Sequence, residues 1–115
     1  MNKPAFVRFL IWLNKGVRSK IVVSKLQKIS KEIKIINVME VMEIGNHKRH
    51  IIACETDQET YEKIFQTKIS FKSRKRKGPA GTRIVGVWSE DKLAKIPQTL
   101  EGSIHIITLR QKFSS

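Results

Sequence analysis

The sequence predicts a single mixed α+β domain, residues 1–115, built around a mostly antiparallel sheet. Its 115 residues are the length of one domain and leave no room for a second. Short apolar runs rich in β-branched and aromatic residues alternate with segments whose apolar residues recur every three or four positions, so we expect both strands and helices. The single cysteine, Cys54, excludes an internal disulfide framework and a cysteine-based zinc site.

The first two predicted elements are a strand and a helix. Residues 6–13 form an apolar run that fits a buried strand or a short buried helix, and its aromatic and β-branched content favours the strand. Residues 18–32 predict a helix, because apolar side chains recur there at intervals of three and four. This apolar stripe consists of Val22, Leu26, Ile29 and Ile33. The remaining arc of the helix is cationic.

A β-hairpin is predicted next. Residues 33–44 are apolar on both faces and rich in β-branched side chains, which is typical of a central strand rather than of a continued helix. The tetrad from Gly45 to Lys48 supplies a turn, and residues 50–56 return as the second strand.

A second helix and a fourth strand complete the predicted core. Thr56 and Glu59 have the spacing of a capping box, which indicates that a helix begins there. The apolar face of this helix consists of Tyr61, Ile64 and Phe65. A strand follows from residue 69, so residues 5–73 have the order βαββαβ. This is the order of the ferredoxin-like fold, in which a four-stranded antiparallel sheet packs both helices on one face.

The remaining residues predict a C-terminal β-α-β extension, residues 82–110. Residues 73–81, SRKRKGPAG, cannot bury a side chain and contain Gly-Pro, so we expect a basic loop there. A strand over 82–88 follows, then a short helix over 90–96 that ends at Pro97, and a last strand over 103–109.

Positive charge is concentrated in two separate segments. The chain has 23 Lys and Arg against 10 Asp and Glu, which gives a formal net charge of +13. Residues 1–34 contribute +8 and residues 68–83 contribute +7, whereas residues 35–67 contribute −3. A surface this basic repels itself unless a polyanion offsets the charge, which favours nucleic acid as the partner.

We therefore expect a non-enzymatic protein that binds RNA or DNA through its phosphates. Four consecutive cations beside a glycine-proline turn suit a phosphate backbone, and the cationic helix face adds to them. The predicted nucleic-acid-binding residues are Arg18, Lys25, Lys28, Lys72, Arg74, Lys75, Arg76, Lys77 and Arg83. The predicted strand at residues 50–54 lacks the glycine and aromatic pattern of the RNA-recognition motif, so the sheet face is not the expected site.

The sequence offers no catalytic or metal-binding constellation, so we expect no enzyme, no cofactor and no metal. His47 and His50 have no carboxylate beside them at ligand spacing, and Cys54 falls in a predicted core strand. The short N-terminal apolar run contains Arg8, so it is neither a signal peptide nor a membrane helix. We expect a cytoplasmic protein without membrane contact.

The alternative function is that of a protein-interaction module with an acidic partner. Residues 84–97, a strand followed by an acidic-capped helix, together with the strand from Ser103, resemble the second half of the subtilisin propeptide and its stand-alone inhibitor relatives. This resemblance implies a protease-inhibitor-like or propeptide-like domain. An accessory subunit that binds an acidic protein is the other form of the same alternative.

Overall fold

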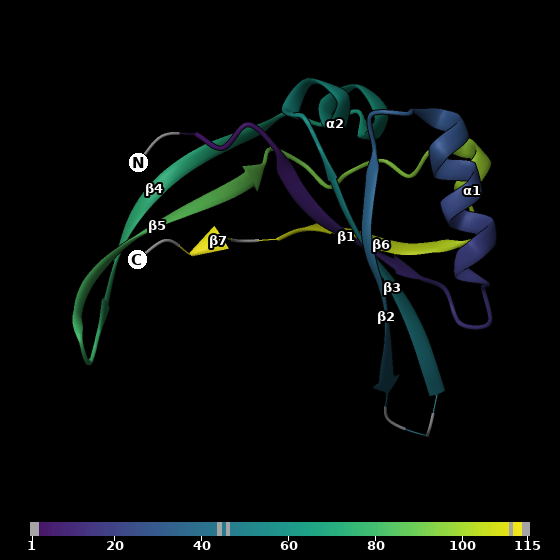
Figure 1. Cartoon of the computed structure of the whole chain (residues 1–115), viewed down its shortest axis with the longest axis horizontal. Helices are drawn as coiled ribbons and strands as arrows, with labels where there is room; N and C mark the ends of the chain where they lie inside the picture. Colours follow the sequence, from purple (N-terminus) through teal and green to yellow (C-terminus); the bar gives the residue numbers. More distant parts are fainter. Residues whose placement is uncertain (1–2, 44, 46, 111, 114–115) are drawn as a thin grey trace.

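A four-stranded antiparallel sheet with two helices forms the body of the molecule, and a long β-hairpin projects from it (Figure 1). The computed structural model describes residues 3–43, 45, 47–110 and 112–113, with the side chains of residues 74, 83, 85, 112 and 113 outside that description. The elements are β1 (Val7–Leu13), α1 (Ser19–Ile29), β2 (Lys34–Glu43), β3 (His47–Thr56), α2 (Gln58–Phe65), β4 (Ile69–Gly78), β5 (Gly81–Glu90), the 3₁₀ helix η1 (Gln98–Leu100), β6 (Ile104–Leu109) and β7 (Lys112–Phe113). The predicted mixed α+β class with a mostly antiparallel sheet is confirmed.

The core lies between β1 and the two helices. Side chains of β1 alternate between the two sides of the sheet, and its inward residues have no exposed area. These inward residues are Val7, Phe9, Ile11 and Leu13. The helices add Val22, Leu26, Tyr61 and Phe65 to the same cluster. The ring of Phe9 meets Tyr61 and Phe65 edge-on, at centroid distances of 5.1 and 5.4 Å, so one strand residue contacts α2 twice.

The body's sheet has the strand order β2-β3-β1-β6, in which β1 pairs antiparallel with both β3 and β6. The sequence predicted that the strand from residue 69 would be the fourth strand of this sheet. Instead, β4 pairs with β5 in a second sheet, which β7 joins. The reason is apolar content: β6 brings Ile104 and Ile107 into the core, whereas β4 beyond Phe71 has only polar, charged and glycine residues.

α1 is shorter than the predicted helix over 18–32. Arg18 has an extended conformation and is the N-cap residue, without a side-chain capping bond. Ser30 ends the helix in an extended conformation, and Lys31 lies in the turn that follows. The first turn contains Lys20 and no acidic residue, an arrangement that the helix dipole disfavours.

α2 begins one residue later than the predicted capping box. Asp57, not Thr56, is the N-cap, and its carboxylate accepts hydrogen bonds from the N–H and the hydroxyl of Thr60, each at 2.7 Å. Both hydrogen bonds lower the pKa of Asp57, and the one from the Thr60 N–H has the larger effect. Thr56 instead donates its hydroxyl hydrogen to the carbonyl of Glu32 at 3.0 Å.

The helix predicted over 90–96 is absent: residue 90 ends β5, residues 91–92 form a bend, and residues 93–96 have no regular secondary structure. Ala94 and Ile96 pack against the core, whereas Leu93 is 72% exposed and Lys95 is exposed. Packed and exposed side chains therefore alternate along this segment, which is not the pattern of a helix. The N–H of Lys95 donates to the carbonyl of Phe65 at 2.7 Å. Because this donor is used by the end of α2, it is not available for a helical turn.

The strands predicted over 6–13, 33–44, 50–56, 82–88 and 103–109 are found as β1, β2, β3, β5 and β6, with residue 44 outside the described residues. The run over 33–44 was predicted as a central strand, and this was wrong: β2 is an edge strand that pairs with β3, and most of its residues are exposed. The runs that form β1, β2, β3 and β6 are rich in apolar or β-branched residues, and these four strands make up the sheet of the body. Within the part of the chain that is described, no helix has the length and apolar character needed to cross a membrane.

Replacing Asp57 with Ala should lower the free energy of unfolding by about 1 kcal/mol, because the Thr60 N–H loses its acceptor. Asp57→Ser keeps an acceptor and should retain most of that stability. The folded-state pKa of Asp57 lies below its unfolded value, so the carboxylate's contribution is complete above about pH 4 and is lost as pH falls through the lower folded pKa. Urea denaturation at neutral pH and in acid measures both effects, and equal losses for Ala and Ser that acid does not alter would contradict this capping role.

Candidate nucleic-acid interface

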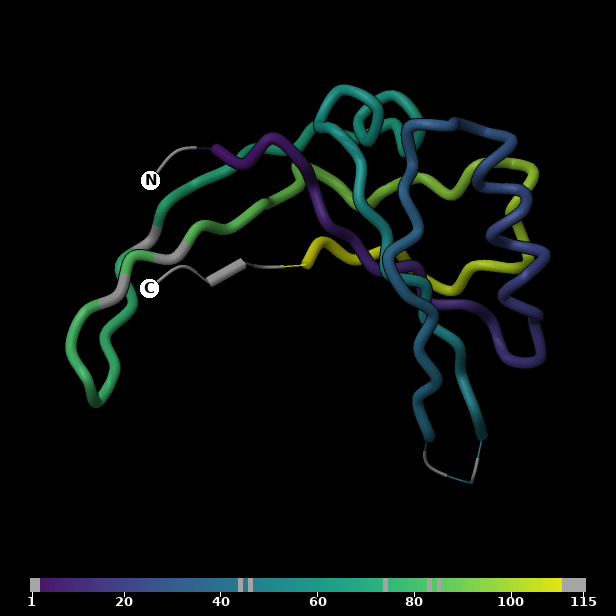
Figure 2. Tube along the Cα trace, viewed as in Figure 1, coloured from purple at the N-terminus to yellow at the C-terminus, as the bar shows by residue number. Residues whose placement is uncertain are grey.

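The β4–β5 hairpin is the most basic element that projects from the body. Its ladder is continuous over ten residue pairs, and only Pro79 and Ala80 lie between the two strands as the turn. Residues 73–81, predicted as a loop, are therefore mostly strand. We define the outer part of this hairpin, residues 72–87, as the arm; Figure 2 follows its trace away from the body.

The outer part of the hairpin forms strands although its described cationic residues do not pack against the hydrophobic core. Residues 73–77 are all polar or charged and cannot bury one face, which is why the sequence predicted a loop there. The ladder instead places cations opposite β-branched residues, with Lys75 opposite Ile84 and Lys72 opposite Val87. Such cross-strand pairs stabilise a ribbon through the aliphatic part of the lysine side chain.

Cations lie on both faces of the arm. Successive residues of a strand alternate between faces, and directly opposite residues share one. Lys75 and Lys77 therefore share one face, and Lys72 and Arg76 share the other. All four residues are exposed, and residues 72–87 contain no Asp or Glu. Within residues 72–87 there is therefore no carboxylate on either face to oppose a polyanion.

Two further predicted residues, Arg74 and Arg83, occupy strand positions in the arm, and their side chains lie outside the described residues. The ladder places Arg83 directly opposite Arg76.

The root of the arm packs against the body. Trp88 is 5% exposed, and its ring lies 5.3 Å from that of Phe71, centroid to centroid. The Nζ atom of Lys3 lies 5.9 Å from the centroid of the Trp88 ring, within the range of a cation–π contact. Burial raises the pKa of Glu90, the last residue of β5. Trp88 therefore anchors the arm, and a side chain this buried does not provide a stacking surface for bases.

Polar side chains of α2 and the turn after it fix the direction in which the arm leaves the body. The carboxylate of Glu62 accepts a hydrogen bond from the N–H of Ile69 at 2.9 Å, and the amide of Gln58 donates to the Ile69 carbonyl at 2.9 Å. The hydroxyl of Thr67 donates to the carbonyl of Lys92 at 2.7 Å. The start of β4 and the segment after β5 are thus both tied to the same region.

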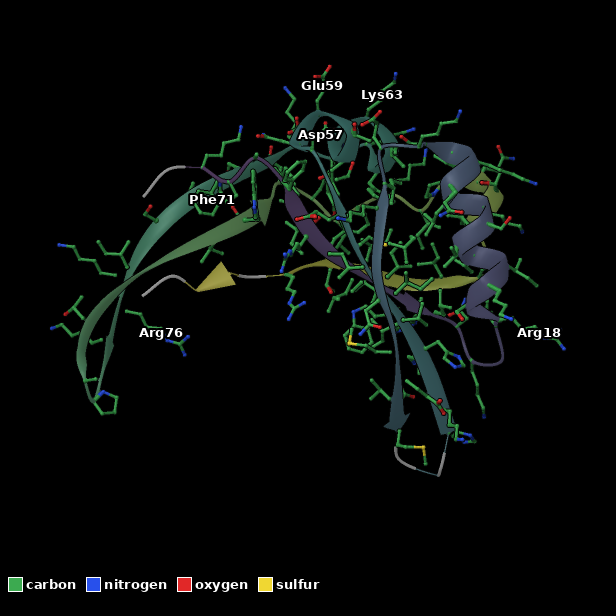
Figure 3. All side chains as sticks on the ribbon, in the orientation of Figure 1. Arg18, Asp57, Glu59, Lys63, Phe71 and Arg76 are labelled. Carbon is green, nitrogen blue, oxygen red and sulfur yellow. The ribbon has the colours of Figure 1, made fainter. Side chains whose placement is uncertain are left out.

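The predicted cations of the first helix lie at the other end of the molecule. Figure 3 shows Arg18 and Arg76 at opposite ends of the longest dimension, which measures 43 Å. Lys25 and Lys28 line a groove beside Thr99, and the Nζ of Lys25 donates to the Thr99 carbonyl at 3.4 Å. The fold therefore groups the arm cations in one place and Lys25 with Lys28 in another, and it does not join them into one surface.

A groove beside α2 has a different character from the arm. Its acidic lining residues are Glu59, Glu62 and Asp91, and its basic ones are Lys63, Lys68 and Lys92. These formal charges cancel, so this groove does not favour a polyanion. Figure 3 shows two of these residues, Glu59 and Lys63, on the outer side of α2.

The histidines and the cysteine do not form a reactive centre. No group of three His, Cys, Asp or Glu that could hold a metal ion occurs among the residues described. The Nε2 atom of His47 lies 3.2 Å from the Nζ of Lys15 at an exposed position. Cys54 is buried, and burial raises its pKa to about 12, which keeps the thiol protonated rather than in its nucleophilic thiolate form.

Sequence reasoning missed the groups that hold the arm in place. The contact of Lys3 with Trp88 and the bonds of Gln58 and Glu62 to Ile69 join residues that no local pattern relates. The sequence did contain one signal for the paired strands of the arm: the β-branched strand from Ile84 requires a partner strand of similar length. The basic run before the turn is the segment that could supply it.

Comparisons with protein-family models, with curated proteins and with solved structures find no match for this chain. No family assignment follows from them. The function is therefore inferred from the geometry and the charge of the molecule itself.

Replacing Lys75 and Lys77 with Ala should change the free energy of unfolding by no more than about 0.5 kcal/mol per site, because both residues are exposed. Trp88→Ala at the root should lower it by about 3–5 kcal/mol, because a buried aromatic ring is lost. Urea denaturation followed by circular dichroism measures both. Similar losses in the two variants would mean that the outer arm contributes to the folded core and would contradict its exposed position.

Proposed function

We propose that the protein binds nucleic acid without catalysing a reaction, and that the arm makes the phosphate contacts. The observation that supports this most strongly is the form of the arm: a two-stranded ribbon that leaves the body, with exposed cations on both faces and no acidic residue over 72–87. A polyanion is the partner that such a surface favours, because it neutralises charges that otherwise repel one another.

A ribbon of this kind fits a groove of duplex DNA. The major groove of B-form DNA is about 12 Å wide and admits a two-stranded β-ribbon. Phosphates line both walls of a groove, so Lys75 and Lys77 face one wall while Lys72 and Arg76 face the other. These contacts give affinity and orientation rather than base specificity. The deep, narrow major groove of A-form RNA excludes the ribbon, so DNA duplex is favoured over RNA duplex.

The other predicted residues take part in two ways. Arg74 and Arg83 belong to the arm by their strand positions and are included in the same contact. Arg18, Lys25 and Lys28 form a second contact region, because they lie at the opposite end of the 43 Å dimension. At about 3.4 Å per base pair, this length corresponds to about 13 base pairs. Only longer duplexes therefore reach both regions.

We further propose that the body is a ferredoxin-like unit into which the hairpin is inserted. The strand order β2-β3-β1-β6 with antiparallel neighbours, and the packing of both helices into one core, support this proposal. In this interpretation β6, not the segment from residue 69, is the last strand of the unit. The β4–β5 hairpin is then an addition between α2 and β6 that serves binding rather than the core.

Binding to duplex DNA across a salt series tests the function. Contacts of the arm with about four to six phosphates predict a slope of roughly −4 to −5 for the logarithm of the binding constant against the logarithm of salt concentration. The variant with Lys75→Ala and Lys77→Ala should reduce the magnitude of this slope by about 1.8. A matched control, Lys63→Ala with Lys68→Ala, removes the same charge from exposed positions beside α2, outside both contact regions. On duplexes of about 10 base pairs, too short to span the molecule, this control should bind like the natural protein.

Two results would argue against the proposal. Equal losses for the two double variants on short duplexes would attribute binding to net charge and not to the arm. A slope near zero with every duplex and single-stranded DNA or RNA would exclude nucleic acid and favour the alternative of a protein partner.

A further inference from the structure

The free edge of the body's sheet is long and apolar. In the described part of the chain β2 is the last strand of the sheet and pairs with β3 only. Its exposed apolar residues are Ile36 (41%), Val38 (41%), Val41 (36%) and Met42 (58%). Of the features with which edge strands commonly prevent pairing, β2 has Lys34 at its start and a bulge at Ile36, whereas residues 37–43 contain no Lys, Arg or Pro and no bulge. An edge of this kind is suited to pairing with a further strand.

Charges beside this edge are balanced within the β2–β3 hairpin. Glu40 forms an ion pair with Lys48 at 3.3 Å, and Glu43 forms one with Arg49. The hairpin therefore differs from the rest of a chain whose formal net charge is +13. Two copies can approach each other here without the cation repulsion that opposes contact at the arm or at α1.

The strand is self-complementary when it is paired antiparallel with itself. In such a symmetric pair one residue lies opposite its own copy, and each other residue lies opposite one on the same face of the sheet. The ladder with β3 skips Ile36, which is the extra residue of a bulge. When Ile36 is left unpaired, the register centred on Met39 places Lys34 opposite Glu43 of the second copy.

This register is the one that the side chains favour. Its remaining pairs are Ile35 with Met42, Asn37 with Val41, and Val38 with Glu40. It uses the full length of β2 and forms an oppositely charged pair at each end. A register centred on Glu40 would place two carboxylates opposite each other, which is destabilising. Registers centred on Val38 or Val41 are shorter and lose the Lys34–Glu43 pairs.

We propose that the free edge of β2 binds a second copy of this chain by antiparallel β2–β2 pairing centred on Met39. The pairing gives the exposed backbone groups of the edge hydrogen-bond partners and covers its apolar side chains. It also joins the two sheets into one and gives the dimer two arms. The proposal does not depend on nucleic-acid binding, because none of the arm residues takes part.

A position-specific cross-link tests the register. Met39→Cys places two thiols opposite each other at about 4.5–5.5 Å between Cα atoms, within the range of a disulfide. Mild oxidation of the full-length variant should therefore give a covalent dimer. The control Leu93→Cys carries its thiol at a position 72% exposed and away from the edge, and should remain mostly monomeric. Cys54 has no exposed area and is present in both variants, so it does not distinguish them.

Sedimentation of the natural protein and of charge variants provides a second test. The natural chain should dimerise with increasing concentration, and Lys34→Glu should raise the dissociation constant about tenfold, because both end pairs then repel. Adding Glu43→Lys to that variant makes the end pairs oppositely charged again but breaks the ion pair of Glu43 with Arg49, so it should restore part of the affinity. A monomer at all concentrations, or equal cross-linking at positions 39 and 93, would overturn the proposal. A dimer whose affinity does not respond to Lys34→Glu would overturn the register.

Discussion

The inward side chains of β1 reach both helices at once, and this shared packing joins elements that lie far apart along the chain. Phe9 contacts Tyr61 and Phe65 of α2, while the same row of β1 packs with Val22 and Leu26 of α1. A domain of this size has one small core and buries a limited fraction of its surface. Because β1 occupies the centre of the sheet, β3 and β6 take their positions from it, and the connection from α2 to β6 is left to form the hairpin outside the core.

The same constraint decides where the positive charge lies. A core filled by apolar side chains of β1, α1 and α2 cannot accept lysine or arginine, so the cations lie at the surface, with Arg76 of the arm and Arg18 beside α1 at opposite ends of the molecule. The arm keeps a fixed direction because Ile69 is held by Glu62 and Gln58 while Trp88 packs against Phe71. We infer that the arm provides a positioned cationic ribbon, which suits phosphate binding better than a mobile tail would.

Elements with a buried face or a β-branched run were predictable from the sequence, whereas the basic outer part of β4 was not. The alternation of β1 and the helical spacing of Val22 and Leu26 report burial directly, so their locations were predicted correctly. The outer arm has two solvated faces, which leaves no alternation to detect. The choice of β6 over β4 as the neighbour of β1 depends on contacts across the fold, and so does the use of the Lys95 N–H by Phe65 in place of a helix. The separation of the arm cations from those of α1 likewise depends on the tertiary fold and could not be predicted.

Amide chemical shifts recorded while a short DNA duplex is added test most directly whether the arm is the binding surface. At constant ionic strength, residues of the arm over 72–87 should shift progressively and saturate, whereas residues of α1 and of the β2 edge should remain near their starting positions. Shifts centred on Lys25 and Lys28 with an unchanged arm, or shifts spread evenly over all exposed lysines, would contradict the assignment of the phosphate contacts to the β4–β5 ribbon.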